Sequence, residues 1–144
     1  MLISTLADRG PTPALVKTMA FAESRLRMIG ENVANIHTPG YRAKQLDVKG
    51  FQRALREAIN IKGDDPAKPL VVSHGLEVTT DKSGFLQVTP SKRPTDNILF
   101  HDGTNLSIER EMADLAETGM THELAATMLR NYFDGLRRAI RGTV

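Results

Sequence analysis

The fold is decided by residues 12–41, which read TPALVKTMAFAESRLRMIGENVANIHTPGY. The Thr12-Pro13 pair is typical of a helix start, because the hydroxyl can cap a free N–H and proline needs no donor in the first turn. Apolar or small residues then recur at alternating spacings of four and three, which places them on one face of a long helix. This N-terminal seam consists of Leu15, Met19, Ala22, Leu26, Ile29, Val33 and Ile36.

A turn is predicted directly after this helix. Thr38 precedes Pro39, and a residue before proline is pushed away from α geometry. Pro39-Gly40 is typical of the centre of a type II turn, in which glycine supplies the positive φ. We expect Tyr41 to anchor the turn against a helix or a neighbouring molecule.

A second long helix is predicted from about Ser107 to Arg141. Ser107 is a favourable N-cap, acidic residues follow it, and arginines stand at the other end, where the helix dipole favours positive charge. Its apolar residues again step by four and three, with Gly119 and His122 making the middle small or polar. The C-terminal seam consists of Ile108, Met112, Leu115, Ala126, Leu129, Phe133, Leu136 and Ile140.

The residues between the two long helices change character. A shorter amphipathic helix is predicted with its stop at Gly63, and its apolar face carries Phe51, Leu55, Ala58 and Ile59. Prolines and alternating segments then predict a β-hairpin around Asp81-Lys-Ser-Gly84. A lone two-stranded hairpin is marginal in water, so this region either packs on a helix or stays mobile until a partner covers it.

These elements predict a mainly α fold. The long N- and C-terminal helices pair as an antiparallel, coiled-coil-like bundle, and the middle region forms a small β-hairpin with loops. The expected organisation is a flexible segment at 1–12, then the helix, turn and short helix at 13–62, the loop and hairpin region at 63–104, and the second long helix at 105–144.

Composition excludes several functional classes. The 144 residues suit one domain, the absence of cysteine removes thiolate sites and disulfides, and five Phe, two Tyr and no Trp are few for a stacking platform. A net charge of +2 without a dense basic run argues against a nucleic-acid partner. The longest stretch without Asp, Glu, Lys or Arg is residues 32–41, too short for the ~20 residues of a membrane span, and the N-terminus has no readable signal peptide.

Catalytic and metal motifs are incomplete. His122 begins a zinc-protease pattern, but Ala126 stands where the second ligand is needed, and the spacing of glycines excludes a phosphate-binding loop. His101, Asp102 and Ser107 supply the residue types of a catalytic triad without a nucleophile elbow. We therefore predict neither an enzyme, nor a metal site, nor a cofactor.

The two seams have two interpretations. They form the core of a self-contained bundle, or they are assembly surfaces that neighbouring molecules cover. We favour assembly surfaces, because the chain has two seams and little other apolar sequence from which to build a core. A loose basic group follows the turn and is interpreted mainly as a solvated face, with an acidic partner as the alternative. Its members are Arg42, Lys44, Lys49, Arg53 and Arg56.

The end of the first helix carries a specific motif, Asn32-Val-Ala-Asn-Ile-His-Thr-Pro-Gly-Tyr-Arg-Ala43. It resembles the signature of flagellar rod and hook-type axial proteins, a helix ending in A-N-x-x-T-P-G-Y. Three further features favour the proximal rod subunit of the flagellar basal body rod protein family: the short chain, the Gly50-Phe51 piece after the turn, and the segment from Asp102 to Leu115. The signature turn comprises Ala34, Asn35, Thr38, Pro39, Gly40 and Tyr41.

The resemblance implies a structural subunit of the proximal rod in the periplasm, required for motility. It implies export without a cleaved signal by the flagellar type III apparatus. The implied partners are other rod subunits, further copies of the chain, an adaptor protein of the membrane ring and the export apparatus. A small helical nucleic-acid-binding or regulatory adaptor protein is the alternative function.

Overall fold

The computed structural model describes residues 10–63, 65, 67–92 and 107–142. Most of the predicted flexible segment, residues 1–9, and the end of the predicted loop region, residues 93–104, lie outside the described residues. The helices are α2 (Thr12–Ala34), α3 (Val48–Lys62) and α4 (Ile108–Arg141). The strands are β1 (Lys44–Gln45), β2 (Val78–Thr80), β3 (Leu86–Val88) and β4 (Ser91–Lys92).

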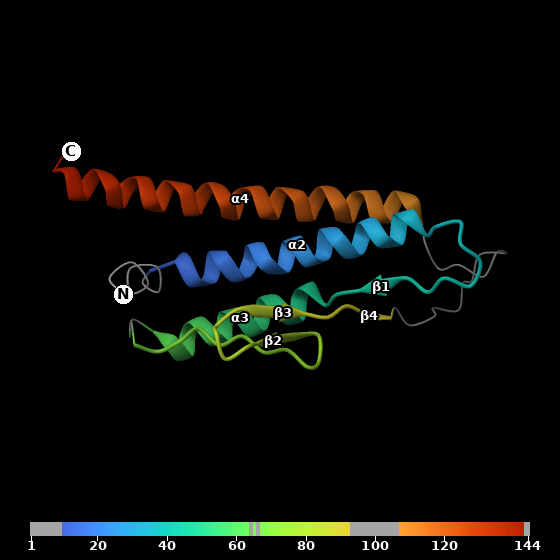
Figure 1. Ribbon diagram of the computed structural model, residues 1–144, viewed down its shortest axis with the longest axis horizontal. Coiled ribbons are helices and arrows are strands. Elements are labelled where there is room, and N and C mark those ends of the chain that lie inside the picture. The colour runs from blue at the N-terminus through green and yellow to red at the C-terminus, as the bar shows by residue number, and fades with distance from the viewer. Residues whose placement is uncertain (1–9, 64, 66, 93–106, 143–144) are drawn as a thin grey trace.

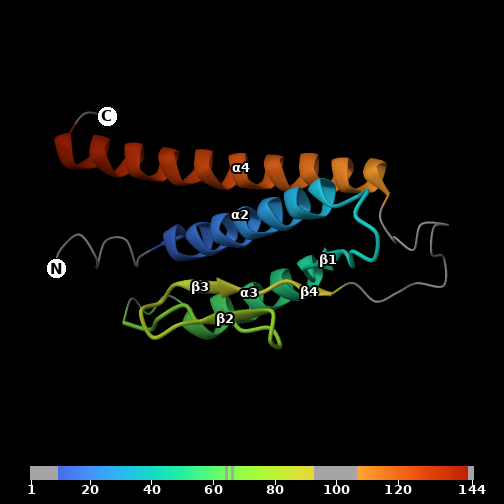
Figure 2. The same cartoon turned by 45° about the vertical axis from the view of Figure 1, so that its right-hand side comes forward.

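The elements form three layers with α2 in the middle. Figures 1 and 2 show α4 along one side of α2, and α3 with the strands along the other. The two long helices are antiparallel, since Glu111 near the start of α4 bonds to Asn32 near the end of α2. The predicted mainly α fold, with paired terminal helices and a small β region between them, is therefore confirmed.

The ends of α2 differ slightly from the prediction. Pro11 occupies the N-cap and its carbonyl accepts from the Leu15 N–H at 3.0 Å, so Thr12 is already helical and its side chain caps nothing. At the other end the helix stops at Ala34, which leaves Ile36 of the N-terminal seam outside the helix. The predicted cap at Thr12 and the continuation of the helix to Ile36 were therefore wrong by a few residues.

The helix α3 is bounded by two local signals. The Asp47 side chain caps its first turn by accepting from the Gly50 N–H at 2.9 Å, and Gly63 ends it with φ of 55°. Gly63 was the predicted stop. Of the predicted apolar face, Phe51 and Ala58 are buried and Leu55 is half-buried; Ile59 is exposed, contrary to the prediction.

The strands form two separate pairs. The predicted hairpin is present, with β2 antiparallel to β3, and the Asp81 carboxylate accepts from the N–H groups of Ser83 and Phe85 at 2.9 Å. A second antiparallel pair, β1 with β4, was not predicted. Its strands have two residues each, too few to show the period-two pattern that identifies a strand.

The hairpin packs on α2. The buried Lys17 ammonium donates to the Gly84 carbonyl at 2.9 Å and approaches the Thr80 hydroxyl at 3.4 Å. The Thr80 hydroxyl bonds in turn to the N–H and the carbonyl of Val72, as a paired strand would. Burial lowers the pKa of Lys17, partly offset by the nearby Asp81 carboxylate. Of the two alternatives for the middle region, packing on a helix is the one observed.

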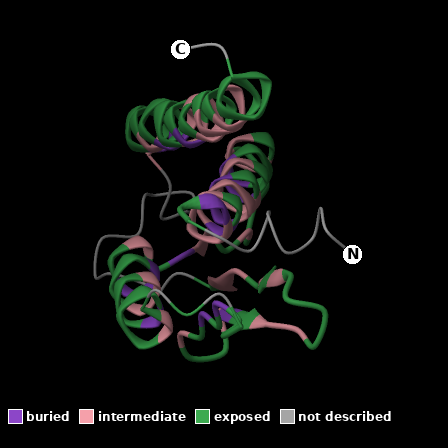
Figure 3. Ribbon diagram, turned by 90° about the vertical axis from the view of Figure 1, so that its left-hand side faces the viewer, coloured by how far each residue is buried: buried purple, intermediate pink, exposed green. Residues whose placement is uncertain are grey.

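The hydrophobic core lies between α2 and the layer of α3 and strands. Phe21 of α2 stacks on Phe51 of α3 with ring centroids 4.0 Å apart. The other buried members of this cluster are Met28, Ile29, Leu46, Ala58, Leu70, Val72 and Val78. By contrast, α4 is mostly exposed (Figure 3). Among the described residues, no helix is long and apolar enough to cross a membrane.

Candidate functional site

The candidate site is the corner at which the chain leaves α2. The end of the helix is closed by Asn35, whose side-chain amide donates to the Glu31 carbonyl at 2.8 Å. The same side chain accepts from the Thr38 hydroxyl at 3.3 Å, and the Asn35 carbonyl accepts from the Thr38 N–H at 2.9 Å. The Glu31 carbonyl also accepts from the Asn35 backbone N–H at 3.2 Å, so Asn35 bonds to it twice and joins the helix end to the turn.

The signature turn has the predicted conformation. The Tyr41 N–H donates to the Thr38 carbonyl at 3.1 Å, which closes a four-residue turn with Pro39 and Gly40 at its centre. Gly40 has φ of 74°, as the third position of a type II turn requires. A side chain at this position would meet no neighbouring atom within 4 Å, so only the backbone conformation demands glycine.

Asn32 holds the chain after the turn against α2. It is fully buried, with 0% of its surface exposed. Its side-chain oxygen accepts from the Lys44 N–H at 2.9 Å, and its side-chain nitrogen donates to the Lys44 carbonyl at 2.9 Å. One amide thus pairs with both backbone groups of a β1 residue, much as a neighbouring strand would.

Two further contacts connect this amide to the turn and to α4. The Tyr41 hydroxyl donates to the Asn32 side-chain oxygen at 3.2 Å, and the Asn32 nitrogen donates to the Glu111 carboxylate at 3.2 Å. Glu111 is also fully buried. Tyr41 therefore anchors the turn as expected, and it does so against α2. We call Asn32, Tyr41, Lys44 and Glu111 the corner cluster.

The charges around the corner cluster stabilise particular protonation states. Burial raises the pKa of the Tyr41 hydroxyl, and the nearby Glu31 and Glu111 carboxylates act in the same direction against Lys44. The Lys44 ammonium donates to Glu31 at 2.6 Å, and this hydrogen bond raises the pKa of Lys44. Tyr41 is therefore a neutral hydrogen-bond donor at physiological pH.

Polar residues also join α2 to α4 further along the helices. The Arg25 guanidinium lies 3.1 Å from the Asp114 carboxylate and 3.7 Å from Glu117. The Arg25 and Asp114 side chains are only 12% and 29% exposed. Arg25 is not part of the N-terminal seam, yet it contributes to the interface between α2 and α4.

The N-terminal seam is only partly the buried face of α2. Ala22 and Ile29 are buried, while Leu15, Met19, Leu26, Val33 and Ile36 are half-buried. The buried residues outside the seam are Thr12, Lys17, Phe21, Met28 and Asn32. A single stripe could not describe this helix, because α2 has neighbours on two sides.

The C-terminal seam is rotated away from α2. The buried residues of α4 are Glu111, Thr118 and Ala125, all outside the predicted seam. Of the seam residues, Ala126, Leu129, Phe133 and Leu136 are half-buried, whereas Ile108, Met112, Leu115 and Ile140 are exposed. The exposed positions do not pack against α2 and remain open to other contacts, while the role of this seam in assembly stays a prediction.

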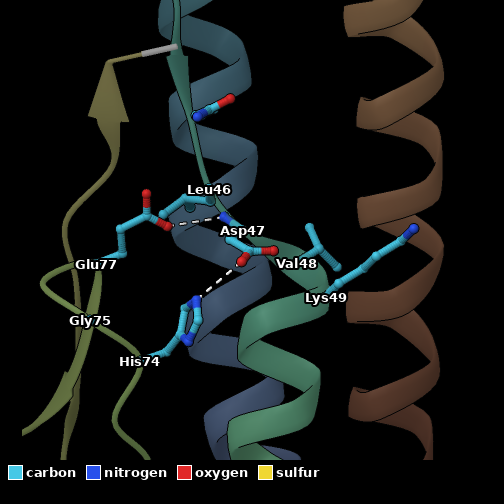
Figure 4. A pocket seen from close by; sticks show the side chains of 8 residues that line it. Leu46, Asp47, Val48, Lys49, His74, Gly75 and Glu77 are labelled. Atoms are coloured by element: carbon cyan, nitrogen blue, oxygen red, sulfur yellow. Dashed lines mark hydrogen bonds and ion pairs between the residues drawn. The ribbon is translucent and has the colours of Figure 1, made fainter. Parts of the chain in front are cut away.

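A polar hollow lies beside the start of α3. Figure 4 shows the His74 ring directed at the Asp47 carboxylate, 3.1 Å away, and Glu77 bonded to the Asp47 N–H at 3.0 Å. The bond from the Gly50 N–H is the main cause that lowers the pKa of Asp47, and His74 adds to it. A β-carbon on Gly50 would collide with the His74 ring and the Asp47 carboxylate. These contacts fix the hairpin to α3.

Within the described residues, no three acidic or histidine side chains are grouped to hold a metal ion. His101 and Asp102, two of the three triad-type residues, lie outside the described residues. In the sequence, Asn32 is part of the motif without an evident role, and Glu111 is one of the acidic residues after Ser107 that the helix dipole favours. The partner of a buried polar residue in a helix can be identified only when the element that packs against that helix is known.

No family model matches the chain. Three curated proteins do, and each is named flagellar basal body rod protein FlgB. The protein from Salmonella typhimurium is 22% identical over 82% of this chain and 83% of its own length. The Bacillus subtilis protein is 23% identical over 92% of this chain and 95% of its own length. The Proteus mirabilis protein is 20% identical, covering 80% and 82% of the two chains.

These matches cover most of the chain, agree with one another across species, and agree with the motif at the corner. Over most of its length, the chain is similar to flagellar basal body rod proteins named FlgB.

Proposed function

We propose that the chain is a structural subunit of the proximal rod of the flagellar basal body. It reaches the periplasm through the flagellar type III export apparatus without a cleaved signal, and motility depends on it. Its partners are further copies, other rod subunits and an adaptor protein of the membrane ring. The observation that carries this proposal is the corner cluster, which holds the family's signature turn in one conformation.

The corner sets the direction in which the chain leaves α2. In an assembled rod, each subunit must present its helices and its hairpin layer at a constant angle to its neighbours. The type II turn and the Asn32 contacts to Lys44 make this angle rigid, since both backbone groups of Lys44 are held. A rod that transmits torque needs such a rigid joint.

The uncovered apolar side chains of α4 support assembly. Ile108, Met112, Met120, Leu124 and Ile140 are 43–80% exposed, on a helix of 34 residues that spans ~51 Å. Each such side chain contributes about 1.5–3 kcal/mol when it is fully buried. Neighbouring subunits supply that burial, and we expect α4 to be less protected in a dilute monomer than in the rod.

Deletion of the gene, followed by imaging of isolated basal bodies, tests the function. We expect membrane rings without a rod and non-motile cells, with rods and motility restored by a plasmid copy. Intact rods in the deletion strain would refute the proposal.

The Pro39→Ala, Gly40→Val double variant tests the role of the corner. Valine at φ of 74° is strained, so the chain should leave α2 at a different angle. We expect lost motility with export still detectable in the periplasm. Gly63→Ala, at a positive φ outside the corner, controls for general backbone strain. Normal motility of the double variant would show that the corner does not set assembly.

A further inference from the structure

An apolar groove runs between α3 and α4, with α2 as its floor. Phe21 and Ala22 of α2 and Phe51 and Leu55 of α3 line it, and Thr118 and Thr121 of α4 form the opposite wall. Figure 3 shows α2 between α4 and the lower layer. We call this hollow the acceptor groove.

The α3 lip of the acceptor groove is basic. Lys49, Arg53 and Arg56 are exposed, and they follow by one position the groove residues Val48, Gln52 and Leu55. One position is a rotation of about 100° around the helix, so the three cations lie on the neighbouring face. Because Phe51 and Ala58 point to the core, this face is the outer one. Figure 4 shows Lys49 extending away from the strands.

The opposite flank of α4 carries an apolar stripe. Ile108, Met112 and Leu115 are 43%, 45% and 36% exposed. The buried residues Glu111 and Thr118 mark the face of α4 that packs on α2. Met112 lies one position after Glu111, and Glu117 of the groove wall lies one position before Thr118. The stripe and the groove wall are therefore on opposite sides of the α2-facing row. We call Ile108, Met112 and Leu115 the donor stripe.

The donor stripe is flanked by acidic residues. Glu109 follows Ile108 and is exposed, and Glu123 lies two heptads further on the same face. The other carboxylates of this part of α4 lie elsewhere, since Glu111 is buried, Asp114 pairs with Arg25 and Glu117 lines the groove wall, so the acidic flank of the stripe consists of Glu109 and Glu123. One flank of the molecule thus presents an apolar groove with a basic lip, and the other an apolar stripe with an acidic lip.

We propose that the acceptor groove of one copy receives the donor stripe of a second copy. Apolar contacts and opposite charges then match across one interface. The whole chain has a net charge of only +2, so repulsion between copies is small. Because donor and acceptor are different surfaces, the contact is head-to-tail and builds a ring or a helical array. This inference rests on the proposed function as a self-associating rod subunit and names the contact between its copies.

Cysteine trapping tests the contact, because the chain has no cysteine of its own. Cells express Met112→Cys and Gln52→Cys variants together, and mild oxidation is applied to isolated basal bodies. A disulfide needs Cα atoms within about 7 Å, so it reports direct contact. We expect mixed dimers, in which one variant is linked to the other, well above random pairing, and a ladder of products from the double variant. Ser83→Cys, on the hairpin turn outside both surfaces, is the control.

A second arm uses charge. Lys49→Glu with Arg53→Glu should reduce the mixed dimer, and Glu109→Lys with Glu123→Lys in the other copy should restore it. Leu115→Cys with Thr121→Cys replaces the first pair if either variant abolishes motility. Dimers of the Met112→Cys variant with itself, random pairing, or exclusive linkage to another rod protein would overturn the inference while leaving the rod function intact. Absence of the chain from basal bodies would instead refute the proposed function.

Discussion

Asn32→Ala should lower the stability of the fold far more than an ordinary polar-to-alanine change. The substitution removes four hydrogen bonds: two to the Lys44 backbone at 2.9 Å, and one each to Tyr41 and Glu111 at 3.2 Å. Each buried group that loses its partner destabilises by about 1–3 kcal/mol. Lys44 is half-buried and water can replace part of its loss, so we expect about 3 kcal/mol in total.

Urea unfolding followed by circular dichroism measures this loss. With an m-value of about 1.5–2 kcal/mol/M, a loss of about 3 kcal/mol lowers the midpoint by roughly 1.5–2 M. The control is Asn131→Ala on the exposed surface of α4, for which we expect a change within about 0.5 kcal/mol. A midpoint for Asn32→Ala equal to that of the control would refute the corner cluster as a stabilising element.

Asn32→Asp separates the hydrogen bonds from the volume of the side chain. The carboxylate still accepts from the Lys44 N–H and from Tyr41, but it stands where the amide now lies 3.2 Å from Glu111. Two buried carboxylates repel, so we expect Asn32→Asp to be less stable than Asn32→Ala at neutral pH. Adding Glu111→Gln supplies a donor and should recover part of the loss. If Glu111→Gln gave no recovery, the Asn32–Glu111 contact would not matter for stability.

Three other perturbations give distinct outcomes. Gly50→Ala should destabilise the fold by about 1–3 kcal/mol, because the new β-carbon meets His74 and Asp47. The control Gly119→Ala, whose β-carbon has nothing within 4 Å, should stabilise the fold by up to about 1 kcal/mol. Equal shifts of the two variants in thermal melting would contradict this. Arg25→Ala breaks the half-buried pair with Asp114 and should lower stability by more than about 1 kcal/mol. Arg27→Ala breaks the exposed pair with Glu23 and should change stability by about 0.5 kcal/mol or less. Urea titrations measure both changes. The pKa of Asp47 is depressed in the fold, so its contribution is present above the unfolded value of about 3.9 and is lost as pH falls through the folded pKa. Asp47→Asn, which keeps a capping side chain, should therefore flatten the acid side of the stability profile between about pH 5 and 2, and an unchanged profile would argue against the cap.

Local signals in the sequence predicted much of the fold because the physics behind them is local. Proline and glycine restrict φ wherever they stand, so the turn at Thr38–Tyr41 and the stop at Gly63 followed from residue type alone. The alternation around Asp81 predicted the hairpin for the same reason. The β1–β4 pair escaped prediction because its two-residue strands are far apart in sequence and show no pattern of their own.

The family motif in the sequence pointed to the corner, but the contacts within the corner required the packed structure. Asn32 is an ordinary helix residue until β1 returns to it and α4 brings Glu111 to its other side. Likewise, the sequence could place Ile108, Met112 and Leu115 on one face without saying what that face meets.

The helices, the turn, the hairpin and the family resemblance could be predicted from the sequence, since each depends on neighbouring residues. Which faces of the helices are buried depends on how the helices pack, and the sequence patterns did not predict it. Because α2 lies between two layers, its burial follows both of them, and polar partners such as Arg25 and Asp114 take positions that an apolar pattern would leave to solvent. The same packing turned the apolar stripe of α4 outward, where a neighbouring subunit can cover it.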